Sequence, residues 1–462
     1  MAHPPNPDRR WGGPYVALAA ILGLALALRL PGLEYGLPFG NLLNPDEQSI
    51  VPRAWRFVHG GGLDPHWFDY PTLVLYLQAP FQAWQGEPSF LTARILVALI
   101  GLGAVAATWW LGRAAYGQVA GAVGAAVVAV ETTHVAYSHM AVTDVPLTAG
   151  IAVALALMVT GRLEWAGLAA GLATGAKYPG VFLLAPLVAA AWGRWRRLGI
   201  AVGLAALGFL ATSPFVLVHP IQAWNDATRV QRLAREGWLG FEDDSFALFA
   251  FVGRLWSGMG PALLVAAAGL VVALVRRRRS DLVIAVFVIA YFVDLLTLRA
   301  HFDRYVLPLV PPLAVLAGRV RPLVPVTLLL LVVPLTWSVR DDVDLTRTDT
   351  RIVAFRWISA HVPRGASIAA ESSTATGRRV LDLQLPHPSR PPDPNRDVAR
   401  LRRKGVDYVV VTGAVADRVL DARRRYPREA RFYDELKRRA KRLYYVESGH
   451  GLAGPWVAVY RL

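Results

Sequence analysis

Two adjacent carboxylates stand shortly after the first apolar stretch of the chain, in the segment Asn44-Pro45-Asp46-Glu47. Neighbouring carboxylates can divide the work of catalysis: one accepts a proton from an attacking hydroxyl group, and the other positions that group or binds a cation. Taken alone, an Asp-Glu pair is a weak signal. Its meaning depends on the residues around it, and at this level either carboxylate can take either role.

Further ionisable residues recur in short segments between apolar stretches: Asp69, His134, His139, Asp144, Lys177, His219, Asp226, His301, Asp303 and Arg304. Ionisable groups near membrane depth are costly, so their positions suggest function. Lys177 is notable because the other lysines, Lys404, Lys437 and Lys441, all stand in the C-terminal tail. The alternative for each single residue is that an outward loop is polar because it is wet.

The elements that must position these residues are membrane helices. Hydrophobic residues make up 54% of the 462 residues, which excludes a soluble two-domain enzyme. Cysteine is absent, so a disulfide framework, a thiolate metal site and a cysteine nucleophile are excluded. Eleven apolar segments approach the length of a membrane span, at residues 14–30, 92–112, 118–136, 143–160, 164–176, 179–192, 198–217, 258–275, 281–298, 304–318 and 322–338.

The orientation follows from the positive-inside rule, because alternate loops hold the arginine clusters. These are Arg9 and Arg10, Arg113, Arg162, Arg194 to Arg197, Arg276 to Arg279, and Arg319 with Arg321. The sequence therefore predicts a multi-pass protein of the inner (plasma) membrane, whose first segment is an uncleaved helix. Arg29, near the outer end of that helix, is expected to reach the interface.

Two large features are expected on the outward side. The membrane domain, residues 1–340, has a large first loop at 33–90, and residues 341–462 form an extracytoplasmic domain. Strand-like runs alternate with arginine-rich helical patterns in the tail, which indicates a small α/β domain; they lie at 367–370, 408–412, 443–447 and 456–460. The basic residues of the tail are read either as a solvated helix face or as a surface for anionic headgroups or an acidic glycan.

Several short motifs acquire meaning from their order along the chain. They are Asn44 to Glu47, Tyr70 to Leu77, Thr143 to Leu147, Gly171 to Pro179 and Asp303 to Pro308. This combination resembles the GT-C membrane glycosyltransferases, in particular the polyprenyl-phosphate-sugar-dependent branch that includes protein O-mannosyltransferases and aminoarabinose transferases. The resemblance covers about residues 15–320, through motifs that are individually weak and specific in their order.

The resemblance implies an inverting transfer of a sugar from a polyprenyl-phosphate carrier to an acceptor on the extracytoplasmic side. It assigns the general base to Asp46 and matches Glu47 to the second catalytic acid. Lys177 and Arg304 then hold the carrier phosphate at outward helix ends beside tyrosines. The residues expected to bind substrate are Asp69, Tyr70, Asp144, Lys177, Tyr178, His301, Arg304 and Tyr305.

The sequence also departs from the best-known relatives. Aminoarabinose transferases have a lysine before paired prolines, where this chain has Tyr70-Pro71-Thr72, so transfer to lipid A is not expected. No segment is long enough for the separate trefoil domain of protein O-mannosyltransferases. The acceptor stays open between a glycan, a lipid and a protein, and the sugar is unspecified. No nucleotide site is evident, since Gly101-Leu102-Gly103 lies inside an apolar span, and no nucleic-acid partner is expected.

Two other functions compete with this hypothesis. A transporter or flippase of lipid-linked sugars would need charged residues deep in the spans, where Glu131 and Asp294 stand out. A scaffolding membrane protein would depend mainly on the tail. A divalent metal ion also stays open, because His134, His139, His219 and His301 could join Glu47 or Asp69, although no spacing fixes a site.

Overall fold

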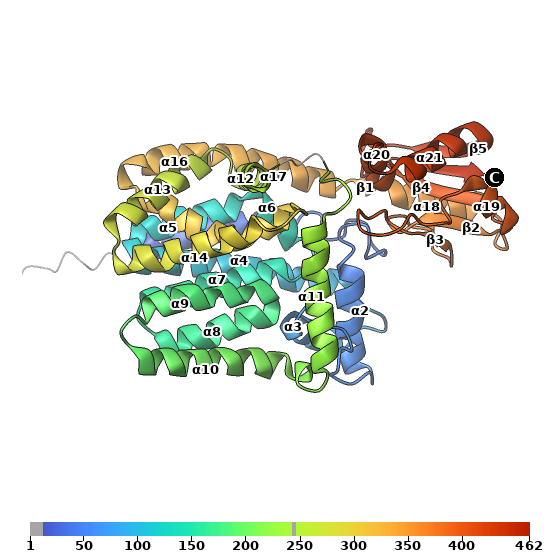
Figure 1. Cartoon of the computed structure of the whole chain (residues 1–462). Coiled ribbons are helices and arrows are strands. Elements are labelled where there is room, and N and C mark those ends of the chain that lie inside the picture. The colour runs from blue at the N-terminus through green and yellow to red at the C-terminus, as the bar shows by residue number, and fades with distance from the viewer. Residues whose placement is uncertain (1–12, 243–245) are drawn as a thin grey trace, which may run out of the picture.

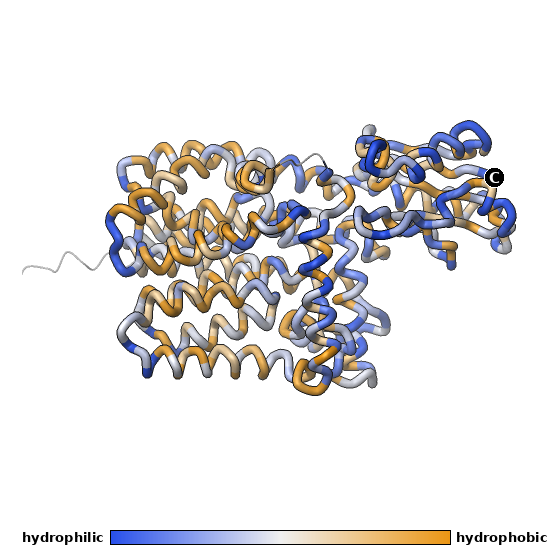
Figure 2. Tube along the Cα trace, viewed as in Figure 1, coloured by the Kyte–Doolittle hydropathy of each residue, from blue (hydrophilic) through white to orange (hydrophobic). Residues whose placement is uncertain are grey.

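The computed structural model describes residues 13–242 and 246–462. A bundle of apolar helices forms most of the chain, and a smaller domain built on a sheet lies beyond one end of it (Figure 1). Hydrophobic residues follow the length of the bundle, whereas hydrophilic residues gather at its two ends and over the sheet domain (Figure 2). This pattern is typical of helices that cross an apolar layer.

The bundle and its connections contain α1 (Gly13–Ala27), α2 (Glu47–Val58), α3 (Leu73–Gln82), α4 (Phe90–Tyr116), α5 (Gln118–Val130), α6 (Thr132–Ser138), α7 (Asp144–Val159), α8 (Leu163–Ala176), α9 (Leu184–Ala190), α10 (Trp195–Thr212), α11 (Pro220–Glu236), α12 (Ala247–Met259), α13 (Ala262–Arg276), α14 (Arg279–Leu295), α15 (Val310–Arg319), α16 (Val324–Leu330) and α17 (Val332–Leu345). Short 3-10 helices precede some of them: η1 (Tyr178–Leu183), η2 (Pro214–Val216), η3 (Asp303–Leu309) and η4 (Arg321–Leu323).

All eleven expected apolar segments coincide with helices, but fewer meet the length and composition of a membrane span. Among the described residues, three do so alone, and up to five do so if two bent pairs are each one span. Helices α5 and α6 form one pair, bent by 61°, and α12 and α13 form the other, bent by 116°. The chain is therefore a helix-rich protein with membrane-spanning segments, and the number eleven stays a prediction.

The bend between α5 and α6 corrects the expectation for Arg29. This side chain is fully buried instead of lying at the interface. The broken helix leaves the carbonyls of Val128 and Ala129 without intrahelical partners, and the Arg29 guanidinium donates to both, at 3.1 and 3.0 Å. It also contacts His134 Nδ1 at 3.0 Å. The arginine is drawn inward because it satisfies a helix end that the bend exposes.

The sheet domain contains strands in the spatial order β3-β2-β4-β7-β5, with β2 parallel to β3 and β4, and β7 antiparallel to β4 and β5. The strands are β2 (Ile368–Glu371), β3 (Leu381–Leu383), β4 (Tyr408–Thr412), β5 (Lys441–Val446) and β7 (Val457–Arg461), with a separate parallel pair of β1 (Thr348–Asp349) and β6 (Leu452–Ala453). Its helices are α18 (Thr350–His361), α19 (Val398–Arg403), α20 (Gly413–Asp421) and α21 (Pro427–Arg439). The four expected strand-like runs coincide with β2, β4, β5 and β7.

Helices α8 and α10 pack closely because glycines recur every fourth residue along α8. A side-chain carbon added at Gly167 or Gly171 would lie 2.0 Å from a backbone carbonyl oxygen of α10. At Gly175 it would lie 2.2 Å from Thr212 Oγ1. Small residues at this spacing let two helix backbones approach each other. The contact matters for the site because Lys177 follows α8 directly.

We expect Gly171→Ala to lower stability by about 1–3 kcal/mol, because its methyl group must push α10 away. Gly203→Ala is the matched control: that glycine lies in α10, and a side-chain carbon there meets nothing within 4 Å. The apparent melting temperature of the purified protein in detergent measures both. Equal melting temperatures for the two variants would contradict the close packing.

Candidate functional site

Three segments that lie far apart in the sequence meet at the carboxylate of Asp46. Tyr70 donates its hydroxyl proton to Asp46 Oδ2 at 2.9 Å, and Arg304 Nη1 donates to the same oxygen at 2.7 Å. Tyr70 stands just before α3, and Arg304 lies in η3. The side chains of Asp46 and Arg304 are 27% and 15% exposed. The carboxylate therefore pairs with a cation and still reaches solvent.

The local sequence explains why Asp46 points into this site. Asp46 is the N-cap residue of α2, and its own backbone N–H donates to Asn44 Oδ1 at 3.0 Å. Its carboxylate makes no capping hydrogen bond to α2, so the carboxylate oxygens are available to Tyr70 and Arg304. The positive end of the α2 helix dipole also favours the ionised carboxylate.

A second ion pair lies beside the first. Lys177 Nζ donates to Asp144 Oδ1 at 2.5 Å, and both residues are buried. Lys177 has an extended backbone between α8 and η1, and Asp144 is the first residue of α7. The ammonium nitrogen lies 5.5 Å from the ring centroid of Tyr70 and 5.7 Å from that of Tyr305. Aromatic faces at this distance attract the cation and shield it from water.

The Arg304 side chain is held from several sides. Its backbone N–H donates to Asp303 Oδ1 at 2.8 Å, and that oxygen also accepts the hydroxyl proton of Tyr137 at 2.8 Å. The guanidinium lies over the rings of Phe302 and Tyr305, at 5.0 and 5.9 Å from their centroids. The arginine is thus placed by its neighbours so that its guanidinium faces Asp46 in the free protein.

Opposing effects act on the pKa of Asp46. Burial works to raise the pKa of this carboxyl group, whereas the Arg304 guanidinium, the Tyr70 hydroxyl and the Lys177 ammonium all lower it. The lowering effects win, and the pKa of Asp46 lies below its ordinary value. Asp46 is therefore ionised throughout the neutral pH range.

Two polar atoms of this cluster are buried and have no hydrogen-bond partner within the described part of the chain: Asp144 Oδ2 and Arg304 Nε. A buried polar atom without a partner costs roughly 1–3 kcal/mol. Such atoms are a feature of sites whose remaining partner is a ligand or an ordered water. The cluster thus offers one acceptor and one donor beyond its internal pairs.

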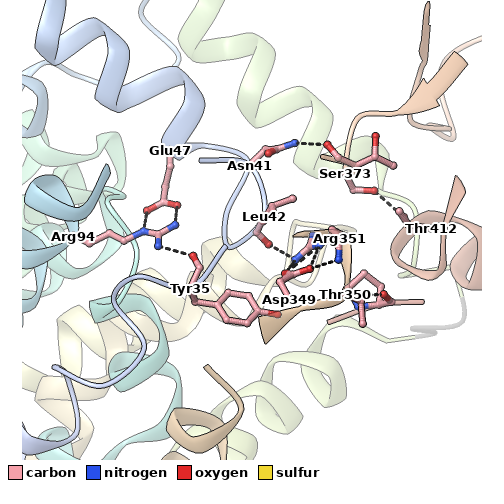
Figure 3. Close-up of polar contacts among 12 residues, drawn as sticks. Tyr35, Asn41, Leu42, Glu47, Arg94, Asp349, Thr350, Arg351, Ser373 and Thr412 are labelled. Atoms are coloured by element: carbon pink, nitrogen blue, oxygen red, sulfur yellow. Dashed lines mark hydrogen bonds and ion pairs between the residues drawn. The ribbon is translucent and has the colours of Figure 1, made fainter. Parts of the chain in front are cut away.

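Glu47 lies in a different environment from Asp46. Arg94 of α4 binds both of its carboxylate oxygens, through Nε at 2.8 Å and Nη2 at 2.7 Å (Figure 3). The backbone N–H of Ala141 donates to the same carboxylate at 2.7 Å, and neither charged side chain is exposed. Arg94 also donates to the carbonyls of Leu33 and Tyr35 at 2.8 Å each. Glu47 therefore fixes the first loop to the bundle.

The other side of the same loop contacts the sheet domain. Arg351 donates to the carbonyl of Leu42 at 2.7 Å while it pairs with Asp349 at 2.5 Å (Figure 3). Asn41 Nδ2 donates to the carbonyl of Ser372 at 2.9 Å. The segment before Asp46 is thus fixed on one side to the bundle and on the other to the sheet domain.

Other expected site residues join the first loop to α11 and η1. Asp69 pairs with Arg229, and Tyr178 donates its hydroxyl proton to the Phe68 carbonyl at 2.8 Å. Asp226 of α11 accepts from the Phe68 backbone N–H at 3.0 Å. These contacts position the loop segment that leads to Tyr70, the residue after Asp69.

His301 packs its ring against Phe251, with 5.1 Å between ring centroids, and its Nε2 lies 3.1 Å from the Leu298 carbonyl. His219 contacts Asp64, and neither Glu47 nor Asp69 joins a histidine in a metal-like group within the described residues. Sequence reasoning missed Arg94 and Tyr137. Arg94 had a usable signal, since it is a charged residue inside an apolar segment.

Comparisons with known proteins give a family and a fold. Residues 67–299, just over half of the chain, match the family model described as Glycosyltransferase family 87. ArnT from Cupriavidus metallidurans bound to undecaprenyl phosphate is similar in structure, with a TM-score of 0.58 and 16% identity over 96% of this chain and 97% of that one. No curated protein matches the chain in sequence.

The apo oligosaccharyltransferase of Archaeoglobus fulgidus gives a TM-score of 0.58 at 12% identity, over 97% of this chain and 74% of that one. The oligosaccharyltransferase AglB of the same organism, in complex with an inhibitory peptide and a dolichol-phosphate, gives 0.57 at 13% identity, over 95% and 73%. At such identities the likeness shows a shared fold. It agrees with the resemblance to GT-C proteins.

We expect Glu47→Gln to destabilise the protein by roughly 3–5 kcal/mol, because the buried Arg94 charge loses its partner. A double variant, Glu47→Gln with Arg94→Met, should recover part of that loss. Glu164→Gln is the matched control, since it breaks a two-oxygen pair with Arg197 whose side chains are 31% and 41% exposed; it should cost less than about 1 kcal/mol. The apparent melting temperatures of the three variants measure these effects. Equal decreases for Glu47→Gln and Glu164→Gln would show that the Glu47–Arg94 ion pair does not stabilise the fold.

Proposed function

The chain belongs to glycosyltransferase family 87, and on that premise we propose that it transfers a sugar from a polyprenyl-phosphate carrier to an acceptor on the extracytoplasmic side of the inner membrane. The observation that carries the proposal is the carboxylate of Asp46 held beside two cations, Arg304 and Lys177. One carboxylate and two cations suit a reaction in which a hydroxyl group loses a proton and a phosphate leaves.

The proposed reaction is a single displacement. The acceptor hydroxyl oxygen forms a bond to the anomeric carbon while the bond from that carbon to the carrier phosphate oxygen breaks. The proton of the hydroxyl group passes to Asp46, and the bond electrons leave with the polyprenyl phosphate. Attack opposite to the leaving group inverts the anomeric configuration.

Arg304 and Lys177 are the proposed partners of the carrier phosphate. The Arg304 guanidinium is a planar group that can bind two phosphate oxygens, and its Nε has no partner within the described chain. Lys177 supplies a compact charge, placed by Asp144 at 2.5 Å. The bound undecaprenyl phosphate and dolichol-phosphate of the structural neighbours support a carrier of this chemical class.

Donor binding would also change the strength of the base. Without a phosphate, Arg304 is committed to Asp46 and lowers its pKa. A phosphate that draws the guanidinium toward itself weakens this effect, while burial continues to raise the pKa of Asp46. The carboxylate then becomes a stronger base at the moment when the donor is in place.

The other predicted residues would act around this centre. Tyr70 and Tyr305 flank the Lys177 ammonium, and the unpartnered oxygen of Asp144 is available to a sugar hydroxyl. Glu47 would act by holding the first loop. Asp69 and Tyr178 would act by holding the segment that leads into Tyr70, and His301, buried against Phe251, by packing beneath the segment that carries Arg304. The acceptor stays open between a glycan, a lipid and a protein.

The finer topology is part of the proposal. We assign eleven spans and a membrane domain to residues 1–340, and an extracytoplasmic domain to 341–462. The charge distribution supports this orientation, because the arginine-rich turns at 194–197 and 276–279 lie at the end of the bundle opposite the sheet domain (Figure 1, Figure 2). The large first loop, 33–90, contributes Asp46 and Tyr70 on the outward side.

We expect Asp46→Asn to lower turnover by roughly 10²–10⁴-fold, the usual contribution of a general base to the rate. The variant should still fold and show a cooperative melting transition. The measurement is release of carrier phosphate from a panel of labelled polyprenyl-phosphate sugars by the purified protein in lipid. Asp294→Asn is the control, since among the described residues that aspartate has one ion-pair partner, Arg235, at a distance of 3.9 Å. Wild-type turnover in Asp46→Asn would refute the assigned base, and donor binding without turnover in the wild type would favour transport.

We expect Arg304→Gln to move the acidic limb of the pH–activity profile to higher pH. Arg304 lowers the pKa of Asp46, and burial raises it; without the guanidinium, Asp46 therefore gains its proton at a higher pH and the base is lost earlier as pH falls. The profile of residual kcat/KM in the variant and the wild type measures the shift. Arg235→Gln, an exposed arginine, should leave the limb in place. A limb that is unmoved in Arg304→Gln would exclude this arginine as the group that tunes Asp46.

A further inference from the structure

Three side chains that the proposed reaction does not use lie together on the outward side. Asp64 and His66 come from the first loop, and His219 is the N-cap residue of α11. One potential ligand atom from each residue lies within 4.8 Å of the other two. Asp64 Oδ2 is 2.7 Å from His219 Nε2 and 3.6 Å from His66 Nδ1. Two imidazole nitrogens and one carboxylate oxygen thus converge.

The spacing suits a small tetrahedral metal ion. Zinc binds histidine nitrogen and carboxylate oxygen at about 2.0–2.2 Å, which places neighbouring ligand atoms roughly 3.3 Å apart. The two distances from Asp64 Oδ2, 2.7 and 3.6 Å, lie on either side of that value. The third pair, the two imidazole nitrogens, lies within 4.8 Å.

The ligand groups are also oriented by their neighbours. The second oxygen of Asp64 accepts from the His66 backbone N–H at 2.9 Å, which leaves Oδ2 directed at the two rings. Gln222 of α11 donates to the His66 carbonyl at 3.0 Å. Contacts of this kind around a site fix the orientation of metal ligands.

The backbone conformation of His66 also indicates that this residue has a function. His66 has a φ of 45°, a left-handed conformation that only a few per cent of residues other than glycine adopt, with asparagine, aspartate and histidine the most frequent among them. The His66 side chain is 63% exposed, so burial in a core does not explain the residue. A strained backbone that aims an exposed imidazole at a carboxylate and a second imidazole is typical of a functional constraint.

We propose that Asp64, His66 and His219 bind one divalent ion of the zinc class, with a fourth position open to water. Imidazole ligands favour Zn²⁺ over the hard ions Mg²⁺ and Ca²⁺, which prefer oxygen. The ion joins the first loop to α11. Because the loop continues from His66 through Phe68 to Tyr70, this junction stabilises the segment that delivers Tyr70 to Asp46. The proposal does not depend on the transfer reaction.

The test is Zn²⁺ binding by the full-length protein, purified without a histidine tag and stripped with a chelator. Competition with a chromophoric zinc chelator gives the affinity and the number of ions. We expect one tight ion for each chain, and at least a tenfold weaker affinity in His66→Ala and in His219→Ala. Excess Mg²⁺ should not displace the zinc.

The matched controls are His59→Ala and His361→Ala, since both histidines are exposed and stack on tryptophans, and neither belongs to the group around Asp64. His66→Ala keeps the test decisive if other variants fail to fold, because its side chain is largely exposed. Zinc should also raise the apparent melting temperature of the wild type and not that of His66→Ala. The proposal is wrong if the wild type binds zinc no better than the His66→Ala/His219→Ala double variant, or if the controls weaken binding equally.

Discussion

The buried ion pair between Arg94 and Glu47 is the contact on which the rest of the site depends. An arginine inside an apolar helix bundle must find an anion, because an uncompensated buried charge costs several kcal/mol. Both carboxylate oxygens of Glu47 accept hydrogen bonds from the Arg94 guanidinium, which also donates to the carbonyls of Leu33 and Tyr35. The first loop is therefore pulled onto the bundle at one defined point. Asp46 stands one residue before that point, so its place follows from the position of Glu47.

Beside the Glu47–Arg94 contact, the charged side chains of the site form two further ion pairs. Asp46 faces Arg304, and Asp144 faces Lys177. Each cation belongs to a different connection between helices, and each is flanked by aromatic rings. The two negative and two positive charges compensate each other, which lowers the desolvation cost of holding them together in a poorly solvated site. Under the proposed function, a phosphate that enters this group would disturb the balance and raise the proton affinity of Asp46, which is the direction that a general base requires.

The sequence predicts the residue types of the site better than their pairing. Asp46, Lys177 and Arg304 are recognisable because they are ionisable groups at the ends of apolar segments, and the structure brings these three together. Glu47 looked equivalent to its neighbour, yet its partner lies 47 residues away in the chain. Which carboxylate meets which cation depends on how helices pack, and no local pattern encodes it.

The fold shows the same division between local and long-range information. Alternating or continuous apolar runs predicted β2, β4, β5 and β7, whereas β1, β3 and β6, of two or three residues, are too short to leave a pattern. Asp342 of α17 lies just beyond the last expected apolar segment, yet it is buried, with Oδ1 3.7 Å from His139 Nε2, because α17 packs against α6. Burial of this kind is decided by a neighbour that is distant in sequence.

The first loop behaves as part of the scaffold, since three neighbours hold it. The bundle binds the loop through Glu47, the sheet domain binds it at the Leu42 carbonyl, and α11 binds it at the Phe68 backbone N–H. A rigid loop keeps Asp46 in place but cannot rearrange to give hydrogen-bond partners to the remaining polar atoms of the site. Asp144 Oδ2 and Arg304 Nε are such atoms within the described chain. Leaving them without partners destabilises the free protein. Under the proposed function, a polar, phosphorylated substrate that supplies a donor and an acceptor would remove this penalty, and the rigidity of the site would then add to its affinity for that substrate.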